Sequence, residues 1–144
     1  MEKVQSHDGT PIAFERVGSG PALIVVNGSL SARSSGVALA ARLAARYTVF
    51  LYDRRGRGDS GDTPPYAVAR EVDDLAAMLG AAGGLAFVFG HSSGGVLALE
   101  AARTLAFSKL AVYEPPFIVD DARAPAPADY LARLNALLAA GQRG

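Results

Sequence analysis

Four short apolar runs, separated by stretches with the pattern of helices, constrain the fold of this chain more than any other feature. The apolar runs are Ala22–Val26, Thr48–Tyr52, Leu85–Phe89 and Leu110–Tyr113. The helical patterns between them cover residues 37–46, 67–82 and 93–105. Continuous apolar runs are typical of strands that are buried on both faces of a sheet. Their alternation with helices predicts an α/β fold, with a mostly parallel sheet, right-handed crossovers and helices on both faces.

Two stretches lie outside this alternation. Before it, Lys3–Ser6 and Ile12–Val17 surround an Asp8-Gly9 turn signal, which predicts an N-terminal antiparallel hairpin. After it, the Pro115-Pro116 pair ends the last strand, and an alanine- and proline-rich segment leads to a helical pattern over residues 128–140.

The composition limits the size of the protein and the kinds of partner that it binds. The 144 residues are 50% hydrophobic, which is enough for one domain with one core. The formal net charge is zero, which favours neither nucleic acid nor an acidic membrane surface as a partner. The absence of cysteine excludes disulfides and thiolate metal sites. A polar first stretch, MEKVQSHDGT, and the lack of an apolar run of ~20 residues predict a cytoplasmic location.

Polar residues directly follow each of the predicted parallel strands. Asn27, Asp53, the His91-Ser92 pair and Glu114 stand at these positions. Because ligands in such folds bind beyond the carboxyl ends of the strands, we expect these residues to line one rim of the sheet.

The pentapeptide GHSSG, Gly90 to Gly94, matches the pattern G-x-S-x-G between a predicted strand and a predicted helix. A serine in so sharp a turn has a strained backbone, and the residues two positions to either side must be small to let the chain pass. The turn lifts the Ser92 hydroxyl above the sheet and places the Ser93 N–H at a helix N-terminus, where a developing oxyanion would sit. A glycine-rich turn that only caps the helix is the simpler alternative.

The segment VVNGSLS, Val25 to Ser31, lies where a second oxyanion donor is expected, in the loop after an earlier central strand. Gly28 would let the backbone approach a substrate, and the Ser29 N–H is the candidate donor. The sequence from Asn27 to Ser29 is equally compatible with an ordinary turn.

The loop YDRRGRGDSGD, residues 52–62, contains three arginines but lacks the glycine spacing of a phosphate-binding loop. Asp53, Asp59 and Asp62 offset the positive charge. The sequence therefore predicts an ion-paired loop under the site.

Together these segments resemble the N-terminal half of the α/β-hydrolases, close to the small esterase-like and lipase-like hydrolases of high-GC bacteria. The segments that carry the resemblance are VVNGSLS, YDRRGRGDSGD, FGHSSGG and LAVYEPPF, in family order and at family spacing. Asn27 stands where the family usually has histidine. The resemblance implies that Ser92 is the nucleophile and that no metal or cofactor is needed. It also implies a hydrolase core over residues 1–123 and the start of a lid over residues 124–144.

The catalytic base of such an enzyme is missing from the sequence. The fold orders its triad as serine, then Asp or Glu, then histidine, and no histidine follows Ser92. His91 is adjacent in the elbow, where successive side chains point in different directions, and His7 is expected to be a solvated turn residue. Glu114 is a candidate triad acid, and the alternative is a buried carboxylate that accepts hydrogen bonds from backbone N–H groups.

The resembling family continues beyond the last residues of this sequence, through the lid, two more strands and the histidine loop. A sheet that ends at Lys109–Tyr113 would leave an apolar edge strand, which invites pairing with another chain. Three explanations are open: a split or nicked enzyme whose remainder is a second polypeptide, a truncated chain, or a short relative that forms a dimer. We favour the first two, in which a second polypeptide or a C-terminal segment completes the fold.

The sequence therefore predicts a serine hydrolase that acts on a small ester or a related acyl substrate. The same fold also supports carbon–carbon cleavage, lyase and cofactor-free peroxidase reactions, and Asn27 in the oxyanion loop is an argument for caution. A non-catalytic binding module is the third hypothesis. The missing base favours it, and the strained turn at Ser92 opposes it.

Overall fold

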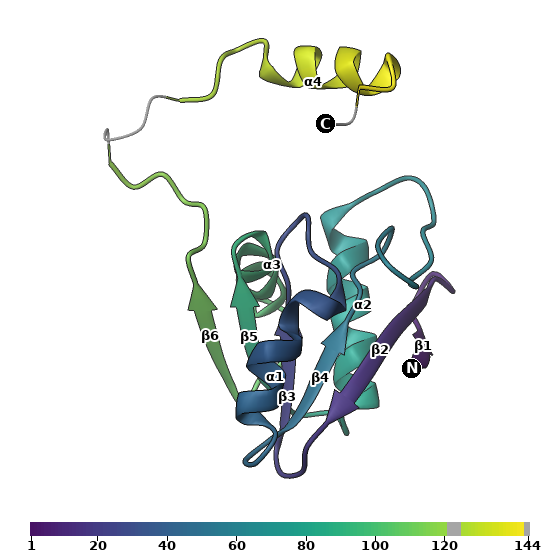
Figure 1. The fold of residues 1–144 in the computed structure, drawn as a ribbon, viewed down its shortest axis with the longest axis vertical. Helices are drawn as coiled ribbons and strands as arrows, with labels where there is room; N and C mark the ends of the chain where they lie inside the picture. The colour runs from purple at the N-terminus through teal and green to yellow at the C-terminus, as the bar shows by residue number, and fades with distance from the viewer. Residues whose placement is uncertain (121–124, 143–144) are drawn as a thin grey trace.

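One mixed sheet organises the part of the chain that the computed structural model describes, residues 1–120 and 125–142 (Figure 1). Its strands are β1 (Glu2–Gln5), β2 (Pro11–Val17), β3 (Ala22–Val26), β4 (Thr48–Tyr52), β5 (Phe87–His91) and β6 (Lys109–Tyr113). The helices are the short 3-10 helix η1 (Arg33–Gly36), α1 (Val37–Leu43), α2 (Val68–Ala81), α3 (Ser93–Ala101) and α4 (Tyr130–Ala139). The order across the sheet is β1-β2-β4-β3-β5-β6.

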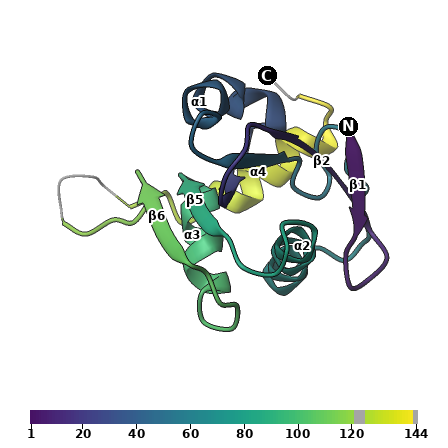
Figure 2. The same ribbon diagram turned by 90° about the horizontal axis from the view of Figure 1, so that it is seen from below.

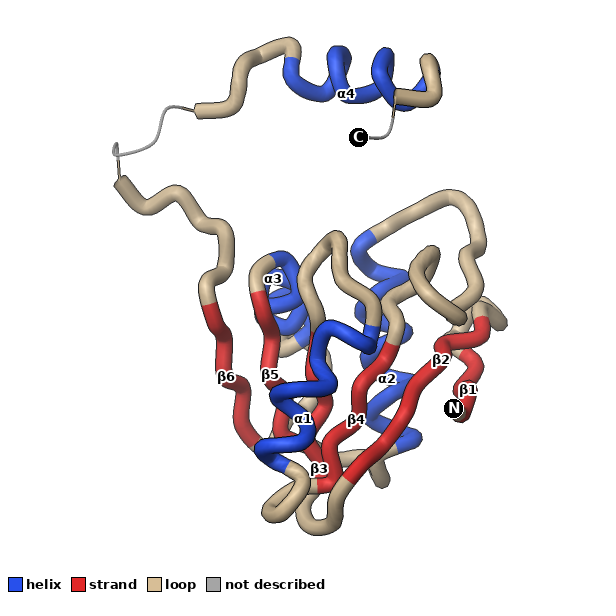
Figure 3. Tube along the Cα trace, viewed as in Figure 1, coloured by secondary structure: helices blue, strands red, loops and turns tan. Residues whose placement is uncertain are grey.

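The pairing of the strands is mostly parallel. β1 and β2 form the predicted antiparallel hairpin, and β2 also pairs antiparallel with β4. β3 pairs parallel with β4 and β5, and β5 pairs parallel with β6. Figure 3 shows the strands side by side in the sheet, in red, with the helices in blue. The predicted α/β fold with an N-terminal hairpin is therefore confirmed.

Helices cover both faces of the sheet, with α1 on one side and α2 and α3 on the other (Figure 2). Alternate residues of β3 point to opposite faces, as the pleat of a strand requires. Ile24 and Val26 belong to the larger core, which includes residues of α2 and α3. Leu23 and Val25 belong to a smaller core with Ala40 of α1. This burial on both faces explains why the central strands are continuous apolar runs in the sequence.

Some element boundaries differ from the sequence expectation. β5 begins and ends two residues later than expected, because His91 still pairs with Tyr113 of β6. α1 ends at Leu43 rather than at residue 46. α3 ends at Ala101 rather than at residue 105, although the Leu105 N–H still donates to the Ala101 carbonyl at 2.8 Å across the turn that follows.

The point at which the connections between strands change direction lies between β3 and β5. The connection after β3 leads through α1 to β4, whereas the connection after β5 leads through α3 to β6 on the other side. Neighbouring strands whose connections leave in opposite directions form the switch point of an open α/β sheet, where ligands bind. The loops after β3 and β5 therefore meet at the carboxyl rim.

α4 differs from the other helices in its surroundings. No residue of α4 is buried, and Figure 1 shows it apart from the sheet. Its exposed apolar side chains recur at helical spacing; they are Tyr130, Leu131, Leu134, Leu137 and Leu138. Among the helices of the described residues, none has the length and apolar character to cross a membrane.

Candidate active site

Ser92 stands in a strained turn between β5 and α3. Its backbone has φ 55° and ψ −127°, a conformation that costs a residue other than glycine about 1–3 kcal/mol. The Ser92 N–H donates to the Tyr113 carbonyl at 2.9 Å, which ties the turn to β6. The Ser92 side chain makes no capping hydrogen bond to α3, so its hydroxyl is not used to stabilise the helix.

Two glycines allow this turn to fit against its neighbours. A Cβ atom on Gly90 would lie 2.6 Å from the Gly95 Cα, closer than real Cβ atoms approach. A Cβ atom on Gly94 would overlap the backbone carbonyl oxygens of Val26 and Asn27. The steric requirement predicted for Gly90 and Gly94 is therefore confirmed.

The loop after β3 packs directly against the turn. Asn27 and Gly28 are buried, and a Cβ atom on Gly28 would lie 3.2 Å from the Ser92 Cβ. The Asn27 side-chain amide donates to the Ala32 carbonyl at 3.2 Å and holds the loop in shape. Ser29, the next residue, is exposed at the rim. The structure thus brings together the two loops that the sequence proposed for an oxyanion hole.

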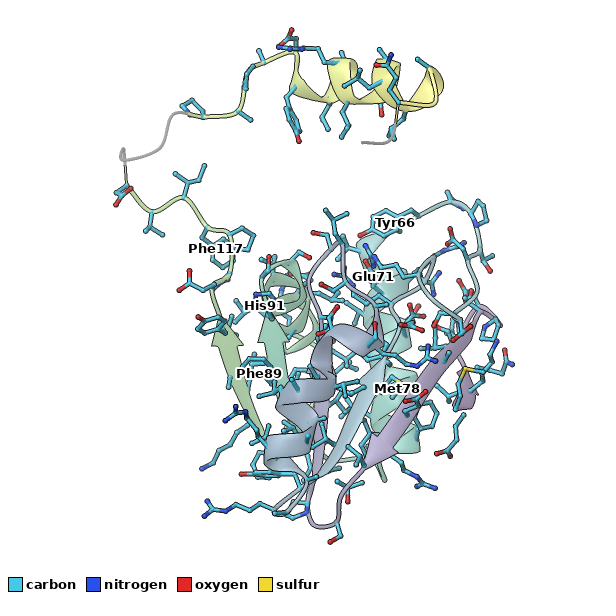
Figure 4. The ribbon with its side chains drawn as sticks, viewed as in Figure 1. Tyr66, Glu71, Met78, Phe89, His91 and Phe117 are labelled. Atoms are coloured by element: carbon cyan, nitrogen blue, oxygen red, sulfur yellow. The ribbon has the colours of Figure 1, made fainter. Side chains whose placement is uncertain are left out.

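Arg54, the second residue of the loop after β4, connects these two loops from beneath. Its Nη1 donates to the Asn27 carbonyl at 3.2 Å and to the Ser93 Oγ at 3.1 Å. Its Nε and Nη2 donate to the two carboxylate oxygens of Glu71 on α2, at 2.6 and 2.7 Å. The Tyr66 hydroxyl donates to the same carboxylate at 2.9 Å, and Figure 4 shows Tyr66 and Glu71 together at this end of α2. One buried ion pair therefore fixes the relative position of the β3 loop and the start of α3.

The surroundings of this pair set its ionisation. The side chains of Arg54 and Glu71 are 6% and 2% exposed. Burial alone would raise the pKa of the Glu71 carboxyl, but the hydrogen bonds and charge of Arg54 outweigh burial and lower it. Burial and the negative charge of Glu71 raise the pKa of the Tyr66 phenol. Glu71 is therefore ionised and Tyr66 neutral at pH 7.

Arg55 and Asp53 of this loop are also paired, as predicted for the loop, although their partners lie on other elements. Arg55 makes a bidentate pair with Asp74 of α2, at 2.8 and 2.6 Å, and a further bond to Asp8 at 2.9 Å. Asp53 is completely buried and accepts hydrogen bonds from Arg33. These pairs fix the loop beneath the rim.

Sequence reasoning missed Tyr66, Glu71 and Asp74. A signal for the two carboxylates was present, because residues 71 and 74 lie four positions before the apolar residues Leu75 and Met78 and therefore on the same face of the helix predicted over residues 67–82. Glu71 and Asp74, taken as whole residues, are each 1% exposed. A carboxylate on an apolar face requires a buried cation, and the arginines of the preceding loop supply it.

Of the remaining candidates, His91 and Glu114 lie at the carboxyl ends of β5 and β6. Glu114 follows β6, is exposed and has φ 49°, so the alternative that its carboxylate is buried and satisfied by the backbone is wrong. The exposed His91 ring stacks on Tyr113 with 5.9 Å between ring centroids. Figure 4 shows His91 at the end of β5. His7 is exposed in the hairpin turn, as expected.

A hollow of ≈ 670 Å³ opens beside the turn. Polar side chains of Arg54, Glu71 and Ser93 line one part of it, and apolar side chains of Val96 and Phe117 line another. The lining includes Ser93, the residue after Ser92, and a largely apolar hollow with a few polar groups is the kind of space that holds a small organic substrate.

We expect the Arg54–Glu71 pair to make stability depend on acid pH. The pKa of Glu71 is lowered on folding, from an ordinary value of 4.5, so its contribution is fully present above that pH. The contribution is lost as the pH falls through the folded-state pKa. Urea unfolding between pH 7 and pH 3 measures this loss, and Glu71→Gln should show a weaker decline over the same range. Equal declines in the two proteins would contradict the assignment.

The fold and the turn at Ser92 together define the class of protein. The family model described as "Alpha/beta hydrolase family" matches residues 23–143, and the chain belongs to this family. The resemblance stated from the sequence is thereby confirmed.

Relatives of known structure or curated description agree with this membership. The solved alpha/beta hydrolase of Sphaerobacter thermophilus DSM 20745 is 63% identical, with a TM-score of 0.97, over 99% of this chain and 56% of that one. The solved esterase RhEst1 from Rhodococcus sp. ECU1013 is 30% identical, with a TM-score of 0.69, over 77% of this chain and 44% of that one. The uncharacterized hydrolase YraK of Bacillus subtilis (strain 168) is 35% identical in an alignment of 96 residues that covers 64% of this chain and 35% of that protein. The chain thus spans about half or less of the length of these relatives.

Proposed function

We propose that this chain carries the nucleophile and the oxyanion hole of a serine hydrolase that acts on small esters or related acyl substrates. The observation that carries the proposal is the strained backbone of Ser92 at the switch point of the sheet, packed against the buried Gly28. Strain of this kind persists only where the surrounding structure enforces it, and it clusters at functional sites. The membership of the family and the esterase among the relatives support the same reaction class.

In the proposed reaction, the Ser92 hydroxyl oxygen attacks the carbonyl carbon of the substrate while a histidine accepts its proton. The N–H groups of Ser93 and Ser29 donate to the resulting oxyanion. Collapse of the tetrahedral intermediate breaks the bond to the leaving group, which takes the proton from the histidine. Water then hydrolyses the acyl-serine by the same steps and regenerates Ser92. Glu114, at the rim after β6, orients the histidine.

The histidine comes from a C-terminal continuation of the polypeptide or from a second chain. Two features support this part of the proposal. The chain covers 56% of the length of its solved relative from Sphaerobacter thermophilus. An open hollow of ≈ 580 Å³, lined mainly by apolar side chains of α1, β5 and β6, lies on the face of the sheet beside α1. A strand of such a segment that paired with β6 would cover the outer edge of the sheet, where β6 is the last strand.

The same proposal assigns residues 1–123 to the hydrolase core and residues 124–144 to the start of a lid. Residue 124 and its neighbours 121–123 lie outside the described residues, as do residues 143–144. The exposed apolar stripe of α4 supports the lid, because such a stripe can close over an apolar substrate. The cytoplasmic location expected from the sequence stays a prediction.

Labelling with a fluorophosphonate tests the function. Native and intact mass spectra first establish which polypeptides accompany the 144-residue chain, and peptide mapping then locates the label. We expect label on Ser92 and hydrolysis of p-nitrophenyl acetate. Ser92→Ala should abolish labelling and lower kcat by roughly 10⁴-fold or more.

Ser19→Ala is the matched control, because Ser19 is exposed in the turn between β2 and β3, away from the carboxyl rim. Its labelling and hydrolysis should equal those of the unaltered protein. If the protein with its completing segment is neither labelled nor active, and Ser92→Ala changes nothing, the proposed function is wrong.

A further inference from the structure

The three arginines at positions 54, 55 and 57 differ in whether a carboxylate accepts hydrogen bonds from their guanidinium groups. Arg54 and Arg55 each make a bidentate pair with a buried carboxylate. No described residue accepts a hydrogen bond from the Arg57 guanidinium, and its one ion pair is a 4.0 Å contact with a Glu71 oxygen. That carboxylate already accepts hydrogen bonds from Arg54 and Tyr66. Among the described residues, Arg57 is therefore the arginine of this loop whose donors are not used.

Arg57 is not a freely solvated surface residue. Its side chain is 28% exposed, so most of it is withdrawn from water. Its guanidinium nitrogens are still reached by water, because among the described residues the buried side-chain atom without a hydrogen-bond partner is the Tyr52 Oη. An anionic ligand that displaces this water would accept hydrogen bonds from donors that no protein group uses.

Arg57 lies next to two parts of the proposed active site. On one side it lines a hollow of ≈ 340 Å³ together with Ser29 and Ser31 of the oxyanion loop. None of the residues that line this hollow is acidic. On the other side the guanidinium approaches Glu71, which lines the larger hollow beside Ser93. Ser29 directly follows Gly28, which packs against Ser92, so the smaller hollow lies next to the loop that faces Ser92.

We propose that the substrate is an acyl compound that carries a carboxylate, and that Arg57 binds this carboxylate. The inference rests on the proposed serine hydrolase function. The planar guanidinium matches the two oxygens of a carboxylate and forms charge-assisted hydrogen bonds with them. The hydroxyl groups of Ser29 and Ser31, in the same hollow, are further donors.

The neighbouring charges favour a carboxylate over a phosphate group. A phosphate monoester carries a charge of about −1.5 to −2 at neutral pH and binds best among several cations. Arg33, Arg54 and Arg55 already have carboxylate partners, which leaves one positive charge for a ligand. One positive charge matches one carboxylate.

A pair of esters of equal length tests the proposal. Monoethyl glutarate carries the carboxylate and ethyl valerate does not, and acid release from both is followed in a pH-stat with the protein and its completing segment. We expect kcat/KM to favour monoethyl glutarate by at least about tenfold, which is the range of a hydrogen-bonded charge. Arg57→Gln should reduce this preference about tenfold or more, chiefly through KM, and Arg57→Lys should retain part of it.

Arg46→Gln is the matched control, because Arg46 is exposed just before β4, at the end of the strand opposite to the rim. It should leave the preference unchanged. Glutarate should also slow fluorophosphonate labelling of Ser92 in the unaltered protein and have little effect in Arg57→Gln.

The outcomes separate the two proposals. If Ser92 is labelled and both esters are hydrolysed with the same kcat/KM before and after Arg57→Gln, the carboxylate inference is wrong and the hydrolase function stands. If Arg57→Gln lowers both reactions equally, Arg57 has only a structural role and the inference is also wrong. If neither ester is hydrolysed and Ser92 is not labelled, the proposed function fails and the inference fails with it.

Discussion

Replacement of Arg54 by methionine should destabilise the protein by about 3–5 kcal/mol, which is the typical cost of removing one partner from a buried ion pair. The substitution leaves the Glu71 carboxylate with only the Tyr66 hydroxyl as a donor, in a place where its side chain is 2% exposed. It also removes the donor to the Asn27 carbonyl and to Ser93. Urea unfolding at pH 7 measures the loss.

The double variant Arg54→Met/Glu71→Leu should recover a large part of this stability. It removes the charge that the single variant leaves unpaired, and apolar replacements of similar volume are often tolerated at buried ion pairs. The two single variants and the double variant together form a cycle that gives the coupling energy. A coupling energy close to zero would contradict the buried pair.

Arg103→Met is the matched control for the same substitution. Arg103 pairs with Glu100 at 2.8 Å on α3, but the two side chains are 73% and 45% exposed. Exposed pairs of this kind contribute about 0–1 kcal/mol. If Arg103→Met and Arg54→Met lower the free energy of unfolding by the same amount, burial does not explain the contribution of the Arg54–Glu71 pair to stability.

The fold could be predicted because each strand is specified by a short stretch of sequence, and the same apolar pattern recurs along the chain. Each central strand is a short apolar run such as Ala22–Val26, and both of its faces are covered, so the pattern is unambiguous. The exact ends could not be predicted so well. Gly90 and His91 extend β5 because β3 and β6 pair with them, and that pairing is a tertiary contact which the sequence of β5 alone does not specify.

The candidate site could be predicted in part, for a similar reason. Ser92, Gly90 and Gly94 lie within five residues, so one local motif specifies the turn and its steric demands. The ion pairs beneath the site join residues that are far apart in the sequence. Arg54 and Glu71 are separated by 17 positions, and the sequence offered other carboxylates closer to this arginine. The choice among them depends on where α2 packs.

Substitution of Gly94 by alanine should cost about 3 kcal/mol, at the upper end of the usual cost of inserting a methyl group into a packed interior. The added Cβ would overlap the carbonyl oxygens of Val26 and Asn27, which are backbone atoms at the end of β3 and cannot rotate away. Relief requires α3 to move away from the loop after β3. The variant should therefore also lose most of its fluorophosphonate labelling at Ser92.

Gly80→Ala is the matched control, because both glycines lie within helices but a Cβ on Gly80 would have no neighbour within 4 Å. Alanine is the better helix former by about 1 kcal/mol, so Gly80→Ala should stabilise the protein by up to that amount and leave labelling unchanged. Unfolding by urea and the rate of labelling are measured for both variants. We expect Gly94→Ala to lower the free energy of unfolding and Gly80→Ala to raise it, with labelling lost only in Gly94→Ala. This result would mean that contact with the loop after β3 holds Ser92 in its reactive position. If Gly94→Ala keeps its labelling, the packing of α3 against the loop is not required for the reactivity of the serine.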